Sequence, residues 1–289
     1  MIKYLLIARM SLLAHIPMIA AGEAMDLILK SKESELQLID IEEYVIAKSL
    51  FTDFKINQPI LHAMLENRSA GKVFTDDKTN PSFMLVCSPS GYVFLGGEPD
   101  QASLIKIASY LKTFSYVSLV SPLAWKFKDF FLEAGFAAVD RIQFQRRAPA
   151  SNLDSWKNKL PSQYSISRIN KENFPQCNWH SFILSCYGES DRFFSNGMGF
   201  CVTDQGKIVS ESYGLIAADK AEIGVVSDPS YYGQNLGTCI CAIMLDYCYK
   251  HNIEPFWSCS ADNPASATIA KKLGFEMDCS YYFLRWVKP

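Results

Sequence analysis

A mixed α/β fold, with a central β-sheet flanked by helices, is the fold class that this 289-residue sequence predicts. Short apolar runs typical of strands recur in both halves of the chain, and stretches with apolar residues at helical spacing lie between them. Each half also ends in a helix, a Gly-Phe pair and a strand, at Gly135-Phe136 and Gly274-Phe275. The repetition fits either the ordinary succession of α/β units or a degenerate duplication.

The best candidate for a domain boundary is the stretch "RRAPASNLDSWKNKLPSQ", from Arg146 to Gln163. It is polar, contains two prolines and separates the two α/β-like halves. We therefore predict one unit over residues 1–150 and a second over residues 160–289.

The second half shows the clearer order of elements. A strand is predicted over Tyr164–Ile169, a helix around 173–187, a hairpin with an Asp-Gln-Gly turn at 204–206, and a strand over Ala221–Ser227. A helix from Leu236, a buried strand "PFWSCSA", a helix "NPASATIAKKLG" and a closing strand follow. Asn263 is the expected N-cap of the last helix, Pro264 its first residue and Gly274 its stop.

The first half shows a fainter version of the same order. A hairpin is predicted over 82–98, a helix over 100–114, a strand over 116–122, a helix over 123–136 and a final strand over 137–145.

Composition excludes several function classes. Apolar residues make up 49% of the chain, so it can bury a core and is not disordered. A net charge of −2 gives no pull toward nucleic acid or anionic membrane. We expect neither as a partner, and the sequence carries no marker of an oligomeric state.

The apolar amino-terminal 24 residues contain Arg9, His15 and Pro17. A membrane span or a signal peptide needs a continuous apolar stretch, and these residues break it. We predict an amphipathic helix packed on the body of the protein.

Nine cysteines lack the paired C-x-x-C spacing of a zinc site and the density of a disulfide scaffold. Cys177, His180 and Cys186 could be proposed as metal ligands, but a convincing fourth ligand is missing. We predict reduced thiols, no metal and a cytoplasmic location.

The stretch "SDPSYYGQNLGTCICAIML", Ser227 to Leu245, places two glycines just before an apolar-striped helix. A helix amino terminus offers unpaired backbone N–H groups and the positive end of the helix dipole, which together bind phosphate groups. Glycine lets the backbone approach the ligand closely. The stretch therefore predicts a phosphate-binding turn.

Residues from about 199 to 286 resemble the core of the GNAT superfamily of acyl-CoA-dependent N-acyltransferases, on the runs "GKIVSESYGLIAADKAEIGVVSDPSYYGQNLGT" and "PFWSCSADNPASATIAKKLGF". The chain is most similar to the branch of zwittermicin-resistance acetyltransferases, and the arrangement in two halves is similar to that of the glycine N-acyltransferases. The resemblance implies two GNAT-like domains in tandem, with acetyl-CoA as co-substrate in the second and a degenerate first domain that forms a wall of the acceptor pocket.

The family motif R/Q-x-x-G-x-G/A fits the turn in two registers. One starts at Gln234. The other, which we prefer because it keeps Leu-Gly-Thr at the helix start, starts at Tyr232 and places Asn235 where a glycine is usual. Asn tolerates left-handed backbone angles, so the path of the turn can survive. The residues that the resemblance assigns to acetyl-CoA are Val225, Val226, Tyr232, Gly233, Gln234, Asn235, Leu236, Gly237, Thr238, Asn263 and Ser266.

Catalysis of amine acylation needs a base, and Glu222 matches a carboxylate position that serves this role in some family members. The usual tyrosine acid lies seven residues after the asparagine, where this chain has Ala270. Tyr281 is our candidate, with Tyr282, Ser266 and Cys259 as alternatives. Trp179, Phe182, Phe193 and Phe194 lie in the segment that covers the acceptor pocket in the family that the chain resembles. They fit either an apolar or aromatic acceptor or ordinary core packing.

The preferred function is acetyl transfer from acetyl-CoA directly to an amine of a small molecule. A catalytically impaired CoA-binding or protein-interaction module is the alternative, because Tyr232, Asn235 and Ala270 depart from the family pattern. An aminoacyl-tRNA donor is disfavoured, since RNA binding calls for a basic face.

Overall fold

The computed structural model of the protein describes residues 36–41, 44–146, 153–217 and 219–289. The first half (residues 36–146) forms β1 (Gln37–Leu38), α2 (Tyr44–Ser49), α3 (Gln58–Leu65), β2 (Lys72–Thr75), β3 (Phe83–Cys87), β4 (Tyr92–Gly97), α4 (Gln101–Leu111), β5 (Tyr116–Pro122), α5 (Lys128–Glu133) and β6 (Ala137–Arg146). The second half (residues 153–289) forms α6 (Asp154–Lys157), β7 (Tyr164–Arg168), the 3₁₀ turn η4 (Phe174–Gln176), α7 (His180–Tyr187), α8 (Ser190–Asn196), β8 (Met198–Asp204), β9 (Lys207–Ala217), β10 (Lys220–Ser227), the 3₁₀ turn η5 (Pro229–Tyr231), α9 (Leu236–Lys250), β11 (Glu254–Ser260), α10 (Pro264–Lys272) and β12 (Phe275–Val287).

All the described strands join one twelve-stranded mixed sheet in the order β1-β2-β3-β4-β5-β12-β6-β11-β10-β9-β8-β7. The strand order is symmetric: β1 to β5 run inward from one edge as β7 to β11 run inward from the other, and β12 and β6 lie at the centre. Both Gly-Phe pairs sit at equivalent helix ends, where Gly135 and Gly274 adopt φ values of 91° and 83°. The two halves are thus related by a pseudo-twofold axis, which supports the duplication over an ordinary succession of α/β units.

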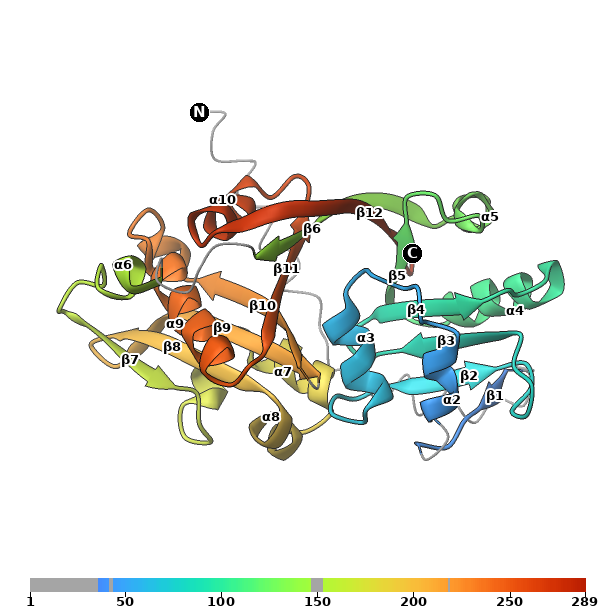
Figure 1. Ribbon diagram of the computed structural model, residues 1–289, viewed down its shortest axis with the longest axis horizontal. Helices are drawn as coiled ribbons and strands as arrows, with labels where there is room; N and C mark the ends of the chain where they lie inside the picture. Colours follow the sequence, from blue (N-terminus) through green and yellow to red (C-terminus); the bar gives the residue numbers. More distant parts are fainter. Residues whose placement is uncertain (1–35, 42–43, 147–152, 218) are drawn as a thin grey trace.

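The closing strands of the two halves are exchanged at the centre of the sheet (Figure 1). β6 leaves the first half and pairs with β11 of the second, while β12 leaves the second half and pairs with β5 of the first. The core residues follow the strands: Phe144 of β6 packs in the core of the second half, and Leu284 of β12 packs in the core of the first. The predicted units 1–150 and 160–289 are therefore interlocked.

Helices cover both faces of the sheet. In the first half, α4 packs against one face and α2 and α3 pack against the other. In the second half, α9 and α10 cover one face, and α7 and α8 cover the other. Helix α3 also contacts β9 and β10, so a first-half helix reaches the second half's part of the sheet.

The predicted hairpin and the last two helices are confirmed. Gln205 and Gly206 both have positive φ, 46° and 85°, as a tight hairpin turn requires. Helix α9 begins at Leu236 and α10 at Pro264, the residues that the sequence predicts.

Two predicted helices are shorter than expected. The helix predicted around 173–187 is interrupted between η4 and α7, because the backbone N–H groups of Asn178 and Trp179 turn toward the carboxylate of Glu211 on β9. The helix predicted over 123–136 is reduced to Lys128–Glu133.

The amphipathic helix predicted for the first 24 residues lies outside the described part of the chain. None of the described helices has the length and apolar character needed to cross a membrane.

Candidate active site

Strands β10 and β11 separate partway along their length. Their parallel pairing runs from Lys220 to Glu222 and is not continued further along the described strands, whereas β10 stays paired with β9 as far as Ser227. The N–H of Asp228 donates to β9, so the backbone groups of even-numbered β10 residues face β9. The N–H of Val225 therefore faces the gap between β10 and β11, while that of Val226 belongs to the β9 ladder.

The turn before α9 contains two residues with positive φ. Asn235 is left-handed, with a φ of 60°, and Gly233 has a φ of 83°. The first i to i−4 hydrogen bond of the helix joins the N–H of Cys239 to the carbonyl of Asn235. The amides of Leu236, Gly237 and Thr238 come before it, so they have no carbonyl partner within the helix. A Cβ at Gly237 would lie 3.3 Å from Ile269 Cδ1 and Ser227 Oγ, so glycine keeps the helix start close to β10.

Two lysines that the sequence analysis did not single out flank this turn. Lys272 Nζ donates to Asn235 Oδ1 at 2.8 Å, and Lys272 and Lys159 both place their ammonium groups over the ring of Trp156. Tyr232, at the position of the family's Arg or Gln, is 59% exposed. The positive charge next to the turn therefore comes from the end of α10 and the segment before β7. The sequence alone did not point to these lysines, because the pair "KK" before "LG" is ordinary at the end of a helix.

Other residues assigned to acetyl-CoA have local structural partners. Gln234 Oε1 accepts a hydrogen bond from the hydroxyl of Tyr164. Asn263 Oδ1 accepts from the N–H of Ser266 at 3.0 Å, the N-cap bond, and Ser266 Oγ accepts from the indole of Trp257 at 3.1 Å. Ala270 is fully buried in the core of the second half, where no side chain of its own could serve as an acid.

Glu222 lies where β10 and β11 separate, since it is the last residue of their pairing. Ser258 Oγ donates to Glu222 Oε1 at 2.6 Å, and Asn57 Nδ2 donates to Ser258 Oγ at 3.1 Å. Burial raises the pKa of Glu222 to about 7, while the hydrogen bond from Ser258, the charge of Arg141 and the side chain of Asn57 lower it. A carboxyl group with this pKa can exchange a proton near neutral pH.

Tyr281 lies in the same buried cluster. It is directly opposite Arg141 in the β6–β12 pairing, and Arg141 Nε donates to the tyrosine hydroxyl at 3.3 Å. Burial raises the pKa of Tyr281, as does the charge of Glu222, and Arg141 lowers it. The structure thus brings together the two residues that the sequence predicts as catalytic, from strands far apart in the chain.

The alternative acids are placed differently. Side chains alternate along a strand, so Tyr282 faces away from Tyr281, and its ring packs under the ammonium of Lys128. Cys259 is buried in the core of the second half, and burial raises its pKa. Tyr281 is the candidate that shares the neighbours of Glu222.

The pseudo-twofold axis relates Glu222 to a tyrosine. On β5, Pro122 pairs with Tyr281, and Ser118, four residues earlier, pairs with Tyr92. On β11, Ser260 pairs with Arg141, and Phe256, also four residues earlier, pairs with Glu222. The pairing of β4 with β5 continues one residue beyond Tyr92, to Val93 and Leu119, and is not continued further along the described strands. The first half therefore keeps the gap but has Tyr92 where the second half has a carboxylate.

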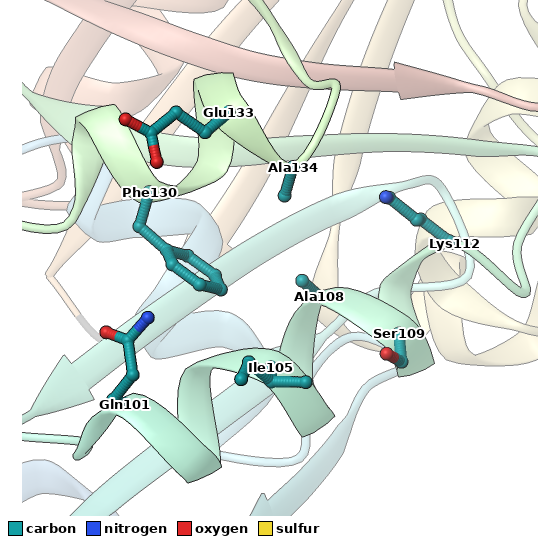
Figure 2. A pocket seen from close by; sticks show the side chains of 8 residues that line it. All are labelled: Gln101, Ile105, Ala108, Ser109, Lys112, Phe130, Glu133 and Ala134. Carbon is teal, nitrogen blue, oxygen red and sulfur yellow. The ribbon is translucent and has the colours of Figure 1, made fainter.

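The first half also lacks a free helix terminus. The carboxylate of Asp100 caps α4, the counterpart of α9, by accepting the N–H of Ser103 at 2.8 Å. An acidic side chain there would repel a phosphate. The hollow between α4 and α5 (Figure 2) lies on the face of the sheet opposite α3 and is lined by Gln101, Ile105, Ala108, Ser109, Lys112, Phe130, Glu133 and Ala134.

Glu211 is a buried carboxylate that sequence reasoning missed. It accepts the backbone N–H groups of Asn178 and Trp179 at 3.0 and 2.7 Å, and burial raises its pKa to about 7. It holds Trp179 over Gly224, where a Cβ would lie 2.7 Å from the indole ring. Trp179 therefore covers the same face of β10 as Glu222, two residues along the strand.

The other aromatic and sulfur-containing residues of this region are mainly packing residues. Phe182 contacts the ring of Trp179, whereas Phe193 is buried and stacks on Phe174. Cys177 and Cys186 lie in the same buried apolar cluster. Among the described residues, no group of histidine, cysteine and acidic side chains has the arrangement of a metal site.

The fold and this site define an acyltransferase. The model of the GNAT acetyltransferase family matches residues 48–284, across both halves. The chain therefore belongs to the GNAT acetyltransferase family and is an N-acetyltransferase.

Known relatives agree with this assignment. The chain is 26% identical over 268 residues to an uncharacterized N-acetyltransferase, YdfB, of Bacillus subtilis, covering 86% of this chain and 97% of the relative. A GCN5-related N-acetyltransferase-like protein of Streptococcus suis has a similar fold, with a TM-score of 0.69 at 22% identity, covering 84% of this chain and 97% of that one. A tandem GNAT protein from the clavulanic acid biosynthesis pathway matches with a TM-score of 0.56 at 10% identity, covering 87% and 98%.

Proposed function

We propose that the protein transfers an acetyl group from acetyl-CoA directly to the amine of a small molecule. The observation that carries this proposal is the position of Glu222, a carboxyl group with a pKa of about 7, at the point where β10 and β11 separate. A base of this pKa is suited to take a proton from an amine near neutral pH.

Acetyl-CoA fits the residues around the gap. The free amides of Leu236, Gly237 and Thr238, with Lys272 beside them, suit the pyrophosphate. The N–H of Val225 faces the gap, where it can stabilise the negative charge that develops on the thioester oxygen. Tyr232, Gly233, Gln234 and Asn235 shape the turn, whereas Val226, Asn263 and Ser266 support the neighbouring backbone.

In the proposed reaction, Glu222 accepts one proton of the acceptor amine as the nitrogen–carbon bond forms. The carbon–sulfur bond then breaks, and the electron pair leaves on the sulfur of CoA. Tyr281 supplies the proton for this thiolate. Because a thiol has a pKa of about 8.5 the thiolate is a tolerable leaving group, and Tyr281 contributes less than Glu222.

Calorimetric titration of acetyl-CoA, together with thiol release over a panel of amines, tests the proposal. We expect binding, and release of CoA with at least one amine. A folded sample that binds no acetyl-CoA at millimolar concentration would contradict it.

The second candidate function, a CoA-binding or protein-interaction module, is favoured by Tyr232, which is exposed, and by Ala270, which is buried in the core. Binding of CoA without thiol release for any amine of the panel would favour this candidate. The zwittermicin-resistance branch and a cytoplasmic location are further parts of the proposal, the latter supported by nine cysteines that are all free.

A further inference from the structure

Asn57 reaches from the first half into the centre of the site. It precedes α3, is fully buried and has a left-handed backbone, with a φ of 48°. Its N–H donates to Gln143 Oε1 at 2.9 Å, and its Nδ2 donates to Ser258 Oγ at 3.1 Å. A buried left-handed residue that is not glycine persists only where its surroundings hold it.

The hydrogen bonds of Ser258 fix the orientation of the Asn57 amide. The ionised carboxylate of Glu222 can only accept, so the hydroxyl of Ser258 must donate its one proton to Glu222. Ser258 Oγ then accepts from Asn57, which requires the NH₂ group of Asn57 on that side. The oxygen Oδ1 of Asn57 is the atom left over.

Two buried oxygens in this network lack a donor. Glu222 Oε2 and Asn57 Oδ1 are both inaccessible to solvent and have no hydrogen-bond partner within residues 36–41, 44–146, 153–217 and 219–289. Both are acceptors, and their side chains share Ser258 as a common neighbour. Buried acceptors in native proteins are normally satisfied by protein groups, ordered water or a ligand, and a ligand with two N–H groups can satisfy both of these oxygens.

We propose that Glu222 Oε2 and Asn57 Oδ1 together bind the acceptor nitrogen, and that Asn57 selects amines over alcohols and thiols. This inference rests on the proposed acetyl transfer. A neutral primary amine has two N–H groups and a lone pair. Glu222 accepts one proton as the nitrogen–carbon bond forms and the carbon–sulfur bond breaks, and the second N–H stays on Asn57 in the amide product.

An alcohol or a thiol has a single proton, which Glu222 accepts. Asn57 Oδ1 would then face the lone pairs of oxygen or sulfur, buried and without a donor. A site built to receive a hydrogen bond rejects a ligand that cannot supply it. Asn57 is therefore a specificity residue contributed by the half that lacks the acetyl-CoA turn.

The test compares Asn57→Gly with Asn67→Gly. Glycine accepts the left-handed backbone, so the first variant removes the amide without adding strain. Asn67 provides the matched control, since it lies past the other end of α3, is exposed and has a φ of 54°. The probes are benzylamine and hexylamine, each compared with benzyl alcohol or hexanol at saturating acetyl-CoA, with the acetylated products measured by mass spectrometry.

For Asn57→Gly we expect the preference for amine over alcohol to fall roughly 10- to 100-fold, mainly through a higher KM for the amine. The KM for acetyl-CoA should change less than about 2-fold, and Asn67→Gly should behave as wild type. Asn57→Ala also removes the amide and should lower the amine preference to a similar extent. It serves as the second variant if Asn57→Gly does not fold.

An unchanged amine preference in Asn57→Gly, or in a folded Asn57→Ala, would overturn the role of Asn57 and leave the proposed function intact. Failure of the wild-type protein to bind acetyl-CoA, or to acetylate either amine, would overturn the proposed function and this inference with it.

Discussion

Burial of Glu222 raises the pKa of its carboxyl group and makes the stability of the protein depend on pH. Its pKa is raised to about 7, above the ordinary value of a glutamate in an unfolded chain. The folded state therefore binds this proton more tightly than the unfolded state does. Stability from this group is greatest at acidic pH and falls as the pH rises from about 4.5 to about 7. Ionisation of Glu222 in the folded protein therefore lowers its stability.

The pH dependence of acetyl transfer should report this group. We expect kcat/KM for an amine to rise with pH and to level off above an inflection near 7, after correction for the ionisation of the amine itself. Glu222→Gln should lower kcat by about 10²- to 10⁴-fold and remove the inflection, because the amide cannot accept a proton. At pH 8, the same variant should unfold at a temperature no lower than wild type. A retained inflection would identify another base.

At the scale of elements, the start of α9 depends on one backbone angle. Asn235 has a φ of 60°, a conformation that asparagine and glycine accept more easily than alanine does. Asn235→Gly should therefore keep the turn and its affinity for acetyl-CoA. Asn235→Ala should lower the free energy of unfolding by about 1 kcal/mol and weaken acetyl-CoA binding.

Thermal unfolding and calorimetric titration would measure the two effects of these variants. Asn252→Ala is the matched control, because Asn252 has a φ of 55° in the loop after α9. It should lose stability without losing affinity. Equal acetyl-CoA affinity for Asn235→Gly and Asn235→Ala would show that the left-handed angle does not matter for binding.

The charge next to this turn gives a separate prediction for Lys272. Its ammonium lies 2.8 Å from Asn235 Oδ1, beside the amides at the start of α9. Lys272→Met should weaken acetyl-CoA binding by roughly 3- to 10-fold and reduce the dependence of the affinity on salt. Titrations at two salt concentrations would measure this, with Lys271→Met as the control on the same helix. A variant with unchanged affinity would place the phosphate away from Lys272.

The sequence predicted those elements that local signals determine. The hairpin turn at Gln205-Gly206, the start of α9 and the Asn263 cap depend on residues a few positions apart. Glu222 and Tyr281 were proposed one at a time, but their proximity was not predicted, because it depends on the pairing of β6 with β12. Asn57 was missed because a buried left-handed asparagine has no local pattern that distinguishes it from an exposed turn residue.

At the scale of the whole molecule, the exchange of β6 and β12 makes the two halves depend on each other. Each strand completes the sheet of the other half, and each delivers a side chain to the other half's core. The exchange also assembles the proposed site, since Arg141 and Asn57 come from one half and Glu222 and Tyr281 from the other. On the proposed mechanism, the first half is needed for catalysis although its own helix start is capped by Asp100.

Leu284 allows this dependence to be tested. It belongs to the last strand of the chain, is fully buried and packs in the core of the first half. Leu284→Ala should lower the free energy of unfolding by about 2–5 kcal/mol, the usual effect of removing a buried leucine side chain. Because the strands are exchanged, both halves should lose stability together, in a single calorimetric transition. Hydrogen exchange should show protection falling equally in β3 and in β9.

Leu119→Ala, in the same core but on the first half's own strand β5, should give the same pattern. Two transitions, or a loss of protection confined to the first half, would show that the halves fold independently and that the exchanged strands only join them.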